Sequence, residues 1–317
     1  IYQCDWSSDV CSSDLLDAAL RRRSMAKIHH LNCISTCPLG GKLMDGFTPS
    51  IVQRGELTLH CLLVELPDCL VLVDTGLGRL DVANPRSRLS RFFLSLVSPD
   101  FRDEMTAFRQ VQSLGYQPRD VRHIVLTHLD FDHAGGLDDF PWATVHLLAT
   151  ERDYAVAQRT WMDRQRFRPQ QWSTREAWQT YAATGGDTWF GFDQVQPLRG
   201  ILPEIAMIPL PGHTFGHAGI AVQGEGDRWL LMAGDAYFYR GEMDQRRPHC
   251  TPGLRFYQWM LEKDRHGRFE SQRRLRELAR DHGSAVHVCC GHDLVEFEAI
   301  AKRRAAEPAT SGTTTLV

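Results

Sequence analysis

The stretch VRHIVLTHLDFDHAGG (121–136) contains the residues that say most about the fold of this chain. Its first seven residues are mostly apolar and β-branched and predict a buried strand. The polar cluster HLDFDH (128–133) follows at once and precedes two glycines. The cluster is therefore expected on a loop between a strand and a helix, a place where chemistry is often found.

Four side chains in this loop can bind metal ions: His128, Asp130, Asp132 and His133. Alternate side chains of an extended segment point to one side, so His128, Asp130 and Asp132 would face the same way. His133 would turn inward as the loop bends toward the glycines. A single cation rarely takes all of its ligands from so short a segment, so the cluster fits two metal ions better than one. A polar loop with solvent-exposed charges is the alternative.

Three further candidate ligands each follow a strand pattern that ends in a turn with glycine. They are presented by IPLPGHTFGH (208–217), MAGDAY (232–237) and VCCGHD (288–293), and they are His213, Asp235 and His292. A lone histidine after a glycine is weak evidence. Three such side chains in order, after the tight cluster, favour one common metal site.

This order of motifs resembles the metallo-β-lactamase superfamily, whose signature His-x-His-x-Asp-His is followed by a histidine, a bridging aspartate and a last histidine. The resemblance extends over most of residues 27–300, including the VDTG turn (73–76) that the family places beneath its metal site. It implies an α/β fold, a four-layer αβ/βα sandwich, with a helical, aromatic-rich insertion at about 151–200.

The resemblance also assigns the ligands: to one metal His128, Asp130 and His213, to a second Asp132, His133 and His292, and to the bridge Asp235. Asp130 stands where the family commonly has histidine, so we expect a third carboxylate in the site. Two dications would then balance three aspartates and a bridging hydroxide, which eases burial. Zinc is the expected metal, with iron or manganese as alternatives because a carboxylate is a hard ligand. Asp74 is expected to hold a ligand histidine, and His217 to be a structural or pocket residue.

Two such metal ions would activate a water molecule, polarise a carbonyl or phosphoryl oxygen and stabilise the leaving oxygen. No G-x-S-x-G motif is present, and none is required. We therefore expect a metal-dependent hydrolase that uses a dinuclear-metal-bound hydroxide to cleave an ester or lactone bond. Asp132 is the expected catalytic carboxylate.

The segment GHDLVEFE (291–298) resembles the end of the quorum-quenching N-acyl homoserine lactonases. Those enzymes carry a tyrosine three residues after the bridging aspartate, where this chain has Phe238. Tyr237 and Tyr239 flank that position, and we expect Tyr237 to act on the substrate in its place. A glyoxalase II-like thioesterase that uses the basic helix 273–280 is the alternative, followed by a diiron redox protein and a noncatalytic sensor.

Aromatic residues gather in the segment 151–200, which holds four of the eight tryptophans. They are interleaved with charged residues instead of forming one apolar face. The segment is either an aromatic lid over the substrate or an excursion that packs locally against the core.

Composition limits the remaining possibilities. Of 317 residues 43% are hydrophobic, and 36 Lys and Arg stand against 39 Asp and Glu, so the excess of positive charge typical of nucleic-acid binding is missing. No apolar run reaches the roughly 18 residues of a membrane span. The cysteines lack paired zinc-ribbon spacing, and an export signal is not evident, which predicts reduced thiols in the cytoplasm. We expect a small-molecule ester, lactone or thioester as substrate, no nucleic acid, no membrane, and a homodimer as an open alternative to a monomer.

The two ends of the chain are not expected to belong to the folded domain. Residues 5–15, DWSSDVCSSDL, resemble a translated sequencing adapter, so we expect 1–24 to be non-native or disordered. The domain is expected over 25–304. A polar tail, 305–317, is expected to be disordered.

Overall fold

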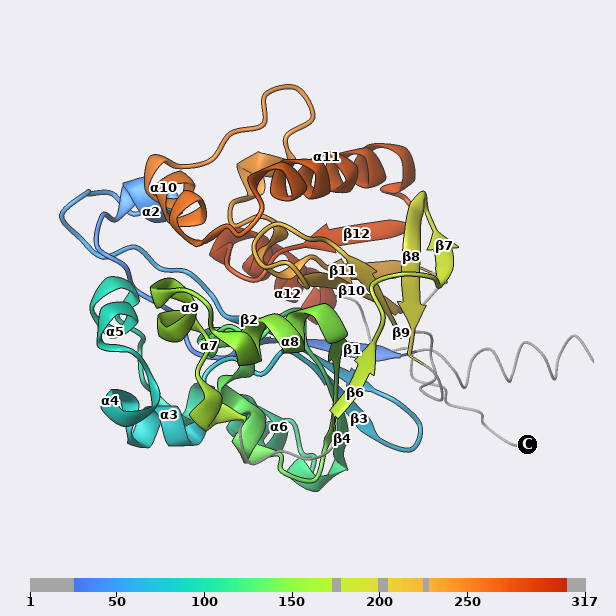
Figure 1. Ribbon diagram of the computed structural model, residues 1–317, viewed down its shortest axis with the longest axis horizontal. Helices are drawn as coiled ribbons and strands as arrows, with labels where there is room; N and C mark the ends of the chain where they lie inside the picture. Colours follow the sequence, from blue (N-terminus) through green and yellow to red (C-terminus); the bar gives the residue numbers. More distant parts are fainter. Residues whose placement is uncertain (1–25, 173–177, 199–204, 225–227, 307–317) are drawn as a thin grey trace, which may run out of the picture.

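Two six-stranded sheets form the centre of the computed structural model, which describes residues 26–172, 178–198, 205–224 and 228–306 (Figure 1). In spatial order the first sheet contains β1 (Lys27–Asn32), β2 (His60–Glu65), β3 (Leu70–Val73), β4 (Val121–Val125), β5 (Thr144–Leu148) and β6 (Trp178–Tyr181). The second contains β12 (Val286–Cys289), β11 (Trp229–Met232), β10 (Ala218–Gln223), β9 (Ile205–Pro209), β8 (Phe192–Pro197) and β7 (Asp187–Trp189). Of the two ends predicted to be disordered, 1–24 and residues 307–317 of the tail 305–317 lie outside the described residues, whereas residues 305–306 belong to the last helix, which ends at Ala306.

The strands β2 and β3 form a hairpin, since they pair antiparallel in a register that places Leu62 opposite Val73. The strands β3, β4, β5 and β6 then run parallel, as the buried apolar runs of the sequence suggest. Among the described strands of the second sheet, β11 and β12 are parallel neighbours and the other neighbouring pairs are antiparallel. The carboxyl ends of β3, β4, β9, β11 and β12 supply the loops of the site.

Helices cover the outer faces of both sheets. Their bounds are α2 (Lys42–Asp45), α3 (Arg79–Ala83), α4 (Pro85–Arg88), α5 (Arg91–Val97), α6 (Ala107–Ser113), α7 (Phe131–Ala134), α8 (Ala149–Ala157), α9 (Trp161–Arg166), α10 (Pro252–Leu261), α11 (Arg265–His282) and α12 (Leu294–Ala306). In Figure 1, α11 lies over the second sheet and α6 lies below the first. None of the helices in the described ranges combines the length and apolar character of a transmembrane span.

Three apolar clusters explain this layering. The cluster between the sheets joins Val73 and Val125 of the first sheet to Met207 and Ile220 of the second. A second cluster lies between the first sheet and α6, and a third between the second sheet and α11. The predicted four-layer αβ/βα sandwich is thereby confirmed.

The segment 151–200 contains helices and strands alike. The helices α8 and α9 lie near the site, whereas β6 extends the first sheet and β7 and β8 extend the second. Most of its aromatic side chains pack into the adjacent clusters; Trp172, for example, is buried and contacts Trp178 edge to face at 6.4 Å between ring centres. The structure therefore favours local packing over a lid for this part of the chain.

Candidate metal centre

All seven predicted ligands are buried and come together between the two sheets. The cluster 128–133 follows β4 and begins α7, so the first sheet supplies His128, Asp130, Asp132 and His133. The turns after β9, β11 and β12 supply the rest: His213, Asp235 and His292. Gly234, directly before Asp235, has a φ of 52°, and an added Cβ would lie 2.7 Å from His217 Nε2. Only glycine gives this turn without strain.

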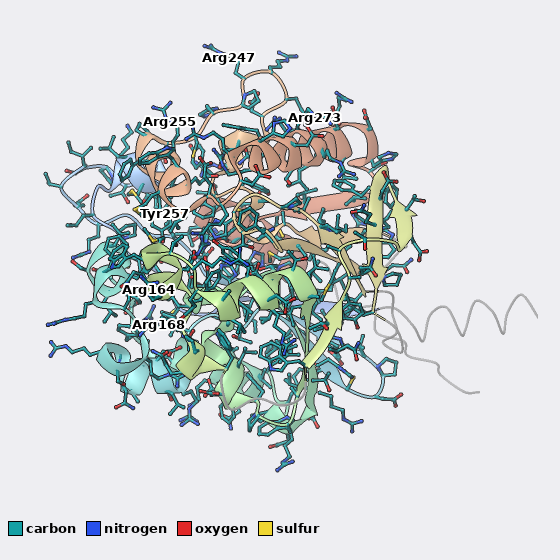
Figure 2. The ribbon with its side chains drawn as sticks, in the orientation of Figure 1. Arg164, Arg168, Arg247, Arg255, Tyr257 and Arg273 are labelled. Carbon is teal, nitrogen blue, oxygen red and sulfur yellow. The ribbon has the colours of Figure 1, made fainter. Side chains whose placement is uncertain are left out.

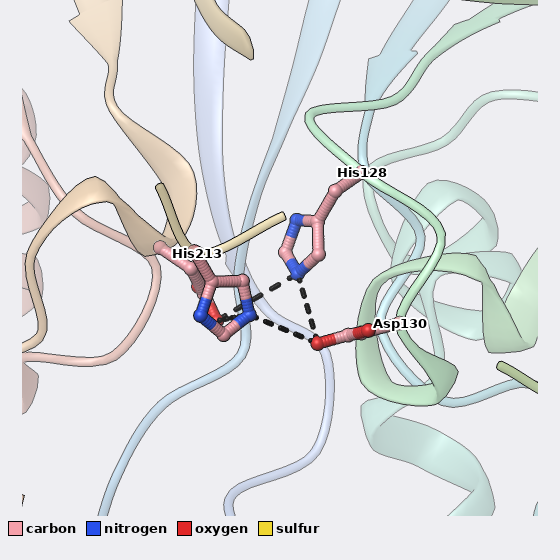
Figure 3. A group of neighbouring side chains, drawn as sticks. His128, Asp130 and His213 are labelled. Carbon is pink, nitrogen blue, oxygen red and sulfur yellow. Dashed lines mark hydrogen bonds and ion pairs between the residues drawn. The ribbon is translucent and has the colours of Figure 1, made fainter. Parts of the chain in front are cut away.

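The first group of candidate ligands consists of His128, Asp130, His213 and Asp235. Asp130 Oδ2 lies 3.3 Å from His128 Nε2 and 2.9 Å from His213 Nε2 (Figure 3). Asp235 Oδ2 lies 3.7 Å from His128 Nε2 and 3.2 Å from His213 Nε2. Four ligand atoms thus point into one small volume.

The second group consists of Asp132, His133 and His292. Asp235 faces this group too, because its Oδ1 lies 3.2 Å from His133 Nε2 and 3.1 Å from His292 Nε2. Asp132 Oδ2 is 4.0 Å from His292 Nε2. Asp235 Oδ2 lies 3.3 Å from His292 Nε2 as well, so the carboxylate contacts both groups, which is the arrangement a bridging carboxylate requires.

Buried partners hold the ligand imidazoles by their second nitrogens. His133 Nδ1 lies 2.8 Å from Asp74 Oδ2, at the position where the sequence places such a partner. His292 Nδ1 lies 2.8 Å from the carbonyl oxygen of Thr58. His217 takes another role, because its Nδ1 lies 3.0 Å from the Leu210 carbonyl and its Nε2 accepts from the amide of Asp235. With both nitrogens used by the backbone, His217 is structural.

The donor set fits divalent metal ions. His128 Nε2, His133 Nε2 and Asp235 Oδ1 are buried, and their close contacts within the described part of the chain lack hydrogen-bond geometry. Leaving such groups unpaired costs roughly 1–3 kcal/mol each, a cost that a cation would remove. Imidazole and carboxylate ligands suit zinc, iron and manganese.

Two aspartates of the site differ in their electrostatic surroundings. Burial raises the pKa of Asp132 to about 6, although the nearby His133 and His292 oppose this shift. Burial acts in the same direction on Asp235, but His292 and His133 outweigh it and hold its pKa well below the usual range. Asp235 is therefore the firmly ionised centre of the cluster.

Arg166, which sequence reasoning missed, reaches the first group from the end of α9. This side chain is fully buried, and its Nε and Nη2 donate to Asp130 Oδ1 and Oδ2 at 2.6 and 2.5 Å. Nη2 also lies 2.6 Å from His213 Nε2. Burial disfavours the charge on Asp130, but this guanidinium holds its pKa well below the usual range. The expected charge balance needs correction, because two dications, a hydroxide, three aspartates and Arg166 leave one net positive charge instead of none.

The tyrosine expected to contact the substrate lies elsewhere. Tyr237 is buried under the second sheet, and its hydroxyl donates to Glu296 at 3.0 Å. Tyr239 packs against His249, with 5.8 Å between ring centres. Phe238 does reach the site, since its ring centre is 4.9 Å from that of His292. The structure thus brings neither flanking tyrosine to the ligands.

A small cavity with a mainly apolar lining opens beside both ligand groups. Its polar lining residues are Thr36, Asp130, Asp132, Asp235, Tyr257 and His292, and its apolar lining residues are Pro38, Met44, Leu57, Phe93, Leu96, Val97, Phe131, Phe238 and Leu261. Three of these apolar residues lie on α5, and three more, Pro38, Met44 and Leu57, come from α2 and the segments on either side of it. The tryptophans of 151–200 that the structure describes do not line it.

Tyr257 is the second functional candidate that sequence reasoning missed. It projects from α10 toward α5 and α9, and it packs against the cluster that contains Phe93 and Val97 (Figure 2). Its ring centre is 5.8 Å from that of Phe238. Burial, reinforced by the charges of Asp132 and Asp130, raises its pKa well above the usual value. No described residue forms a hydrogen bond with its hydroxyl, which is therefore available to a ligand.

Comparisons with known proteins agree with this geometry. The family model for the metallo-beta-lactamase superfamily matches residues 54–292. A probable metallo-hydrolase of Mycobacterium tuberculosis is 39% identical over 267 residues, which cover 84% of this chain and 80% of that protein. An N-acyl homoserine lactonase of a Bacillus species is 24% identical over 215 residues, 67% of this chain and 78% of the lactonase.

A solved structure gives the same fold. The crystal structure of a mutant of Bacillus thuringiensis AiiA with N-decanoyl-L-homoserine bound at its active site superposes with a TM-score of 0.65. The match covers 87% of this chain and 96% of that one at 19% identity. At this identity the likeness concerns the fold and leaves the substrate open.

Proposed function

Because the chain belongs to the metallo-beta-lactamase superfamily, we propose that it is a dinuclear metallohydrolase that cleaves an ester or lactone bond in a small molecule. The observation that carries this proposal is the carboxylate of Asp235, whose oxygens face two separate ligand groups beside one apolar cavity. The cytoplasmic location and the homodimer stay predictions.

The first metal would be held by His128, Asp130 and His213, the second by Asp132, His133 and His292, and Asp235 would join them. Zinc is the metal we propose, with iron or manganese as alternatives. When bound, two such cations supply Lewis acidity that activates water and polarises an ester carbonyl.

The cavity supports an apolar acyl or aryl group on the substrate. Side chains of α5 and of the segment around α2 would remove this group from water, and each buried methylene contributes roughly 0.8 kcal/mol to binding. The ester carbon would then lie at the polar end of the cavity, beside Asp132 and Asp235. Specificity would follow from the length and shape of the apolar wall.

Tyr257 would orient the ester, because this residue lines the same cavity and no described residue forms a hydrogen bond with its hydroxyl. A hydroxyl aimed at the carbonyl or leaving oxygen stabilises the charge that develops there. We assign this role to Tyr257 instead of Tyr237, whose hydroxyl is committed to Glu296. Asp132 also lines the cavity and forms no hydrogen bond with the described residues, which supports a role in moving a proton to the leaving oxygen.

The structure gives less support to recognition of glutathione by the helix 273–280. Arg273 forms ion pairs with Glu270 and Glu277 along α11, and Arg280 pairs with Asp281. This helix covers the outer face of the second sheet, where Figure 2 labels Arg273 on the side away from α5. A thioesterase remains the alternative, but the only feature that supports it is the metal site, which thioesterases and lactonases of this kind have in common.

The test combines metal analysis with a hydrolysis screen of lactones, including N-acyl homoserine lactones, esters, thioesters and phosphotriesters. We expect metal-dependent turnover of esters or lactones, and loss of both metal and activity in a folded His128→Ala variant. Turnover of thioesters alone would favour the glyoxalase II-like alternative, and oxygen consumption by an iron-loaded protein would favour the redox alternative. Full metal occupancy with no turnover would favour a sensor.

A further inference from the structure

Arg166 is held in place from several sides. Its Nη1 donates to the carbonyl oxygen of Leu261 at 2.7 Å, while Nε and Nη2 hold both oxygens of Asp130. Every nitrogen of the guanidinium is thus in use. A buried arginine engaged in this way is a fixed charge, in contrast to a surface arginine that samples many positions.

The helix that carries Arg166 is itself anchored. Thr160 caps α9 by accepting from the amide of Asp163, and Asp163 forms a 2.5 Å ion pair with Lys263. Directly after Arg166, the backbone of Phe167 forms a bridge with that of Asp130. The same backbone contact that positions Asp130 therefore positions the guanidinium beside it.

The guanidinium uses atoms that a metal ion in the first group would need. Asp130 Oδ2 and His213 Nε2 are both candidate ligands, and Arg166 Nη2 lies within 2.6 Å of each. A neutral imidazole nitrogen has one lone pair, so it cannot accept this hydrogen bond and bind a cation at the same time. Filling the first group therefore requires breaking the contact between Arg166 and His213.

The second group lacks such a competitor. Across the described ranges, no lysine or arginine forms an ion pair or hydrogen bond with Asp132, His133 or His292. The net charge of the site also makes a second cation bind more weakly than the first. The three aspartates and Arg166 together carry two net negative charges, which a single dication neutralises. A further dication would enter a buried site that is already neutral.

We propose that Arg166 makes the two metal positions unequal: a first cation binds at Asp132, His133 and His292, and a second binds at His128, Asp130 and His213 only in competition with the guanidinium. This inference rests on the proposed function in that it assumes a metal site. It adds the order in which the two metal positions are filled, and it names Arg166 as the residue that determines this order.

The test is a titration of metal-free protein with cobalt(II), followed by calorimetry and by the visible absorption of the bound ion. We expect two classes of site in the unaltered chain, the second weaker by about tenfold or more, because a charge-assisted hydrogen bond must be broken. In Arg166→Met the second cation should bind more tightly and the two classes should approach each other. Arg166→Lys, which keeps the charge but lacks the planar fork, should give an intermediate result.

Arg88→Met is the matched control. Arg88 is also largely buried and pairs with two aspartates, Asp81 and Asp138, but contacts no candidate ligand. Its loss should leave both metal affinities unchanged.

Two equal sites in the unaltered chain would overturn the inference while leaving the proposed function intact. Absence of metal binding in folded protein would overturn both. If Arg166→Met does not fold, the unaltered chain and Arg166→Lys still test the proposal. Two sites of equal affinity in the unaltered chain would contradict it, and so would a ratio of the two affinities in Arg166→Lys that equals the ratio in the unaltered chain.

Discussion

Asp74→Asn is the substitution that best isolates how the protein orients a ligand histidine. Asp74 is buried at the end of β3 and has a φ of 55°, which asparagine tolerates, so the backbone should not change. Its Oδ1 accepts from the amide of Thr127 at 2.8 Å, and its Oδ2 accepts from the Thr127 hydroxyl at 2.8 Å and lies 2.8 Å from His133 Nδ1. Asparagine can keep the first contact only by turning its NH₂ toward the other two groups.

The expected effect follows from these contacts. The NH₂ group cannot accept from His133, so the imidazole loses a charge-assisted hydrogen bond worth roughly 1.5–3 kcal/mol. We expect metal affinity at the second group to fall by about 10- to 100-fold, the range typical when a partner of a ligand histidine is removed. The assay is competition for zinc with a chromophoric chelator, together with thermal unfolding of the metal-free protein.

Asp81→Asn provides the comparison, because Asp81 is equally buried and accepts from the backbone amide of Gly78, away from the ligands. It should lower stability without weakening metal binding. Unchanged zinc affinity in Asp74→Asn would refute the idea that Asp74 fixes His133.

Three further predictions concern the bridge, the cavity and pH. Asp235→Asn should lower metal affinity by more than about 100-fold and abolish hydrolysis in a folded protein, which metal analysis and circular dichroism would check; retained metal would contradict a bridge. Tyr257→Phe should lower kcat by about 10- to 100-fold with metal content unchanged, whereas Tyr237→Phe should mainly lower stability; the reverse pattern would return the role to Tyr237. Burial raises the pKa of Glu151 to about 7, above its usual 4.5, so its stabilising contribution is complete below about 4.5 and is lost as pH rises through 7. Glu151→Gln should therefore remove about 3 kcal/mol of pH dependence from the free energy of unfolding over that window, and an unchanged slope in denaturation at several pH values would speak against it.

The strands and the candidate ligands could be predicted from the sequence because both are local signals. An apolar run that ends at glycine predicts the end of a strand. Each candidate ligand lies within a few residues of a strand end, as Asp235 does after β11. The parallel course of β3 and β4 then brings Asp74 and the cluster 128–133 to the same edge of the sheet. Motifs that are separate in the sequence therefore lie close together at this edge of the first sheet.

Arg166 and Tyr257 could not be found in this way, because each enters the site from a helix whose place depends on tertiary packing. Arg166 is one of several arginines in a charged segment, and only the bridge between Phe167 and Asp130 brings its side chain to the ligands. The replacement of the usual histidine by Asp130 was a usable signal, since a buried extra carboxylate calls for a cation. Tyr237 and Phe238 are adjacent, but Tyr237 packs into the cluster under α11 whereas Phe238 lines the cavity beside the candidate ligands.

The shared position of Asp235 between the sheets also bears on how long the protein would last in a cell. Its partners His128 and His133 belong to one half of the sandwich, whereas His213 and His292 belong to the other. A bound ion would therefore fasten the halves to each other, and metal starvation would raise the population of open forms that proteases recognise. The cellular amount of this protein would then depend on the supply of its metal, even before a loss of catalysis could be measured.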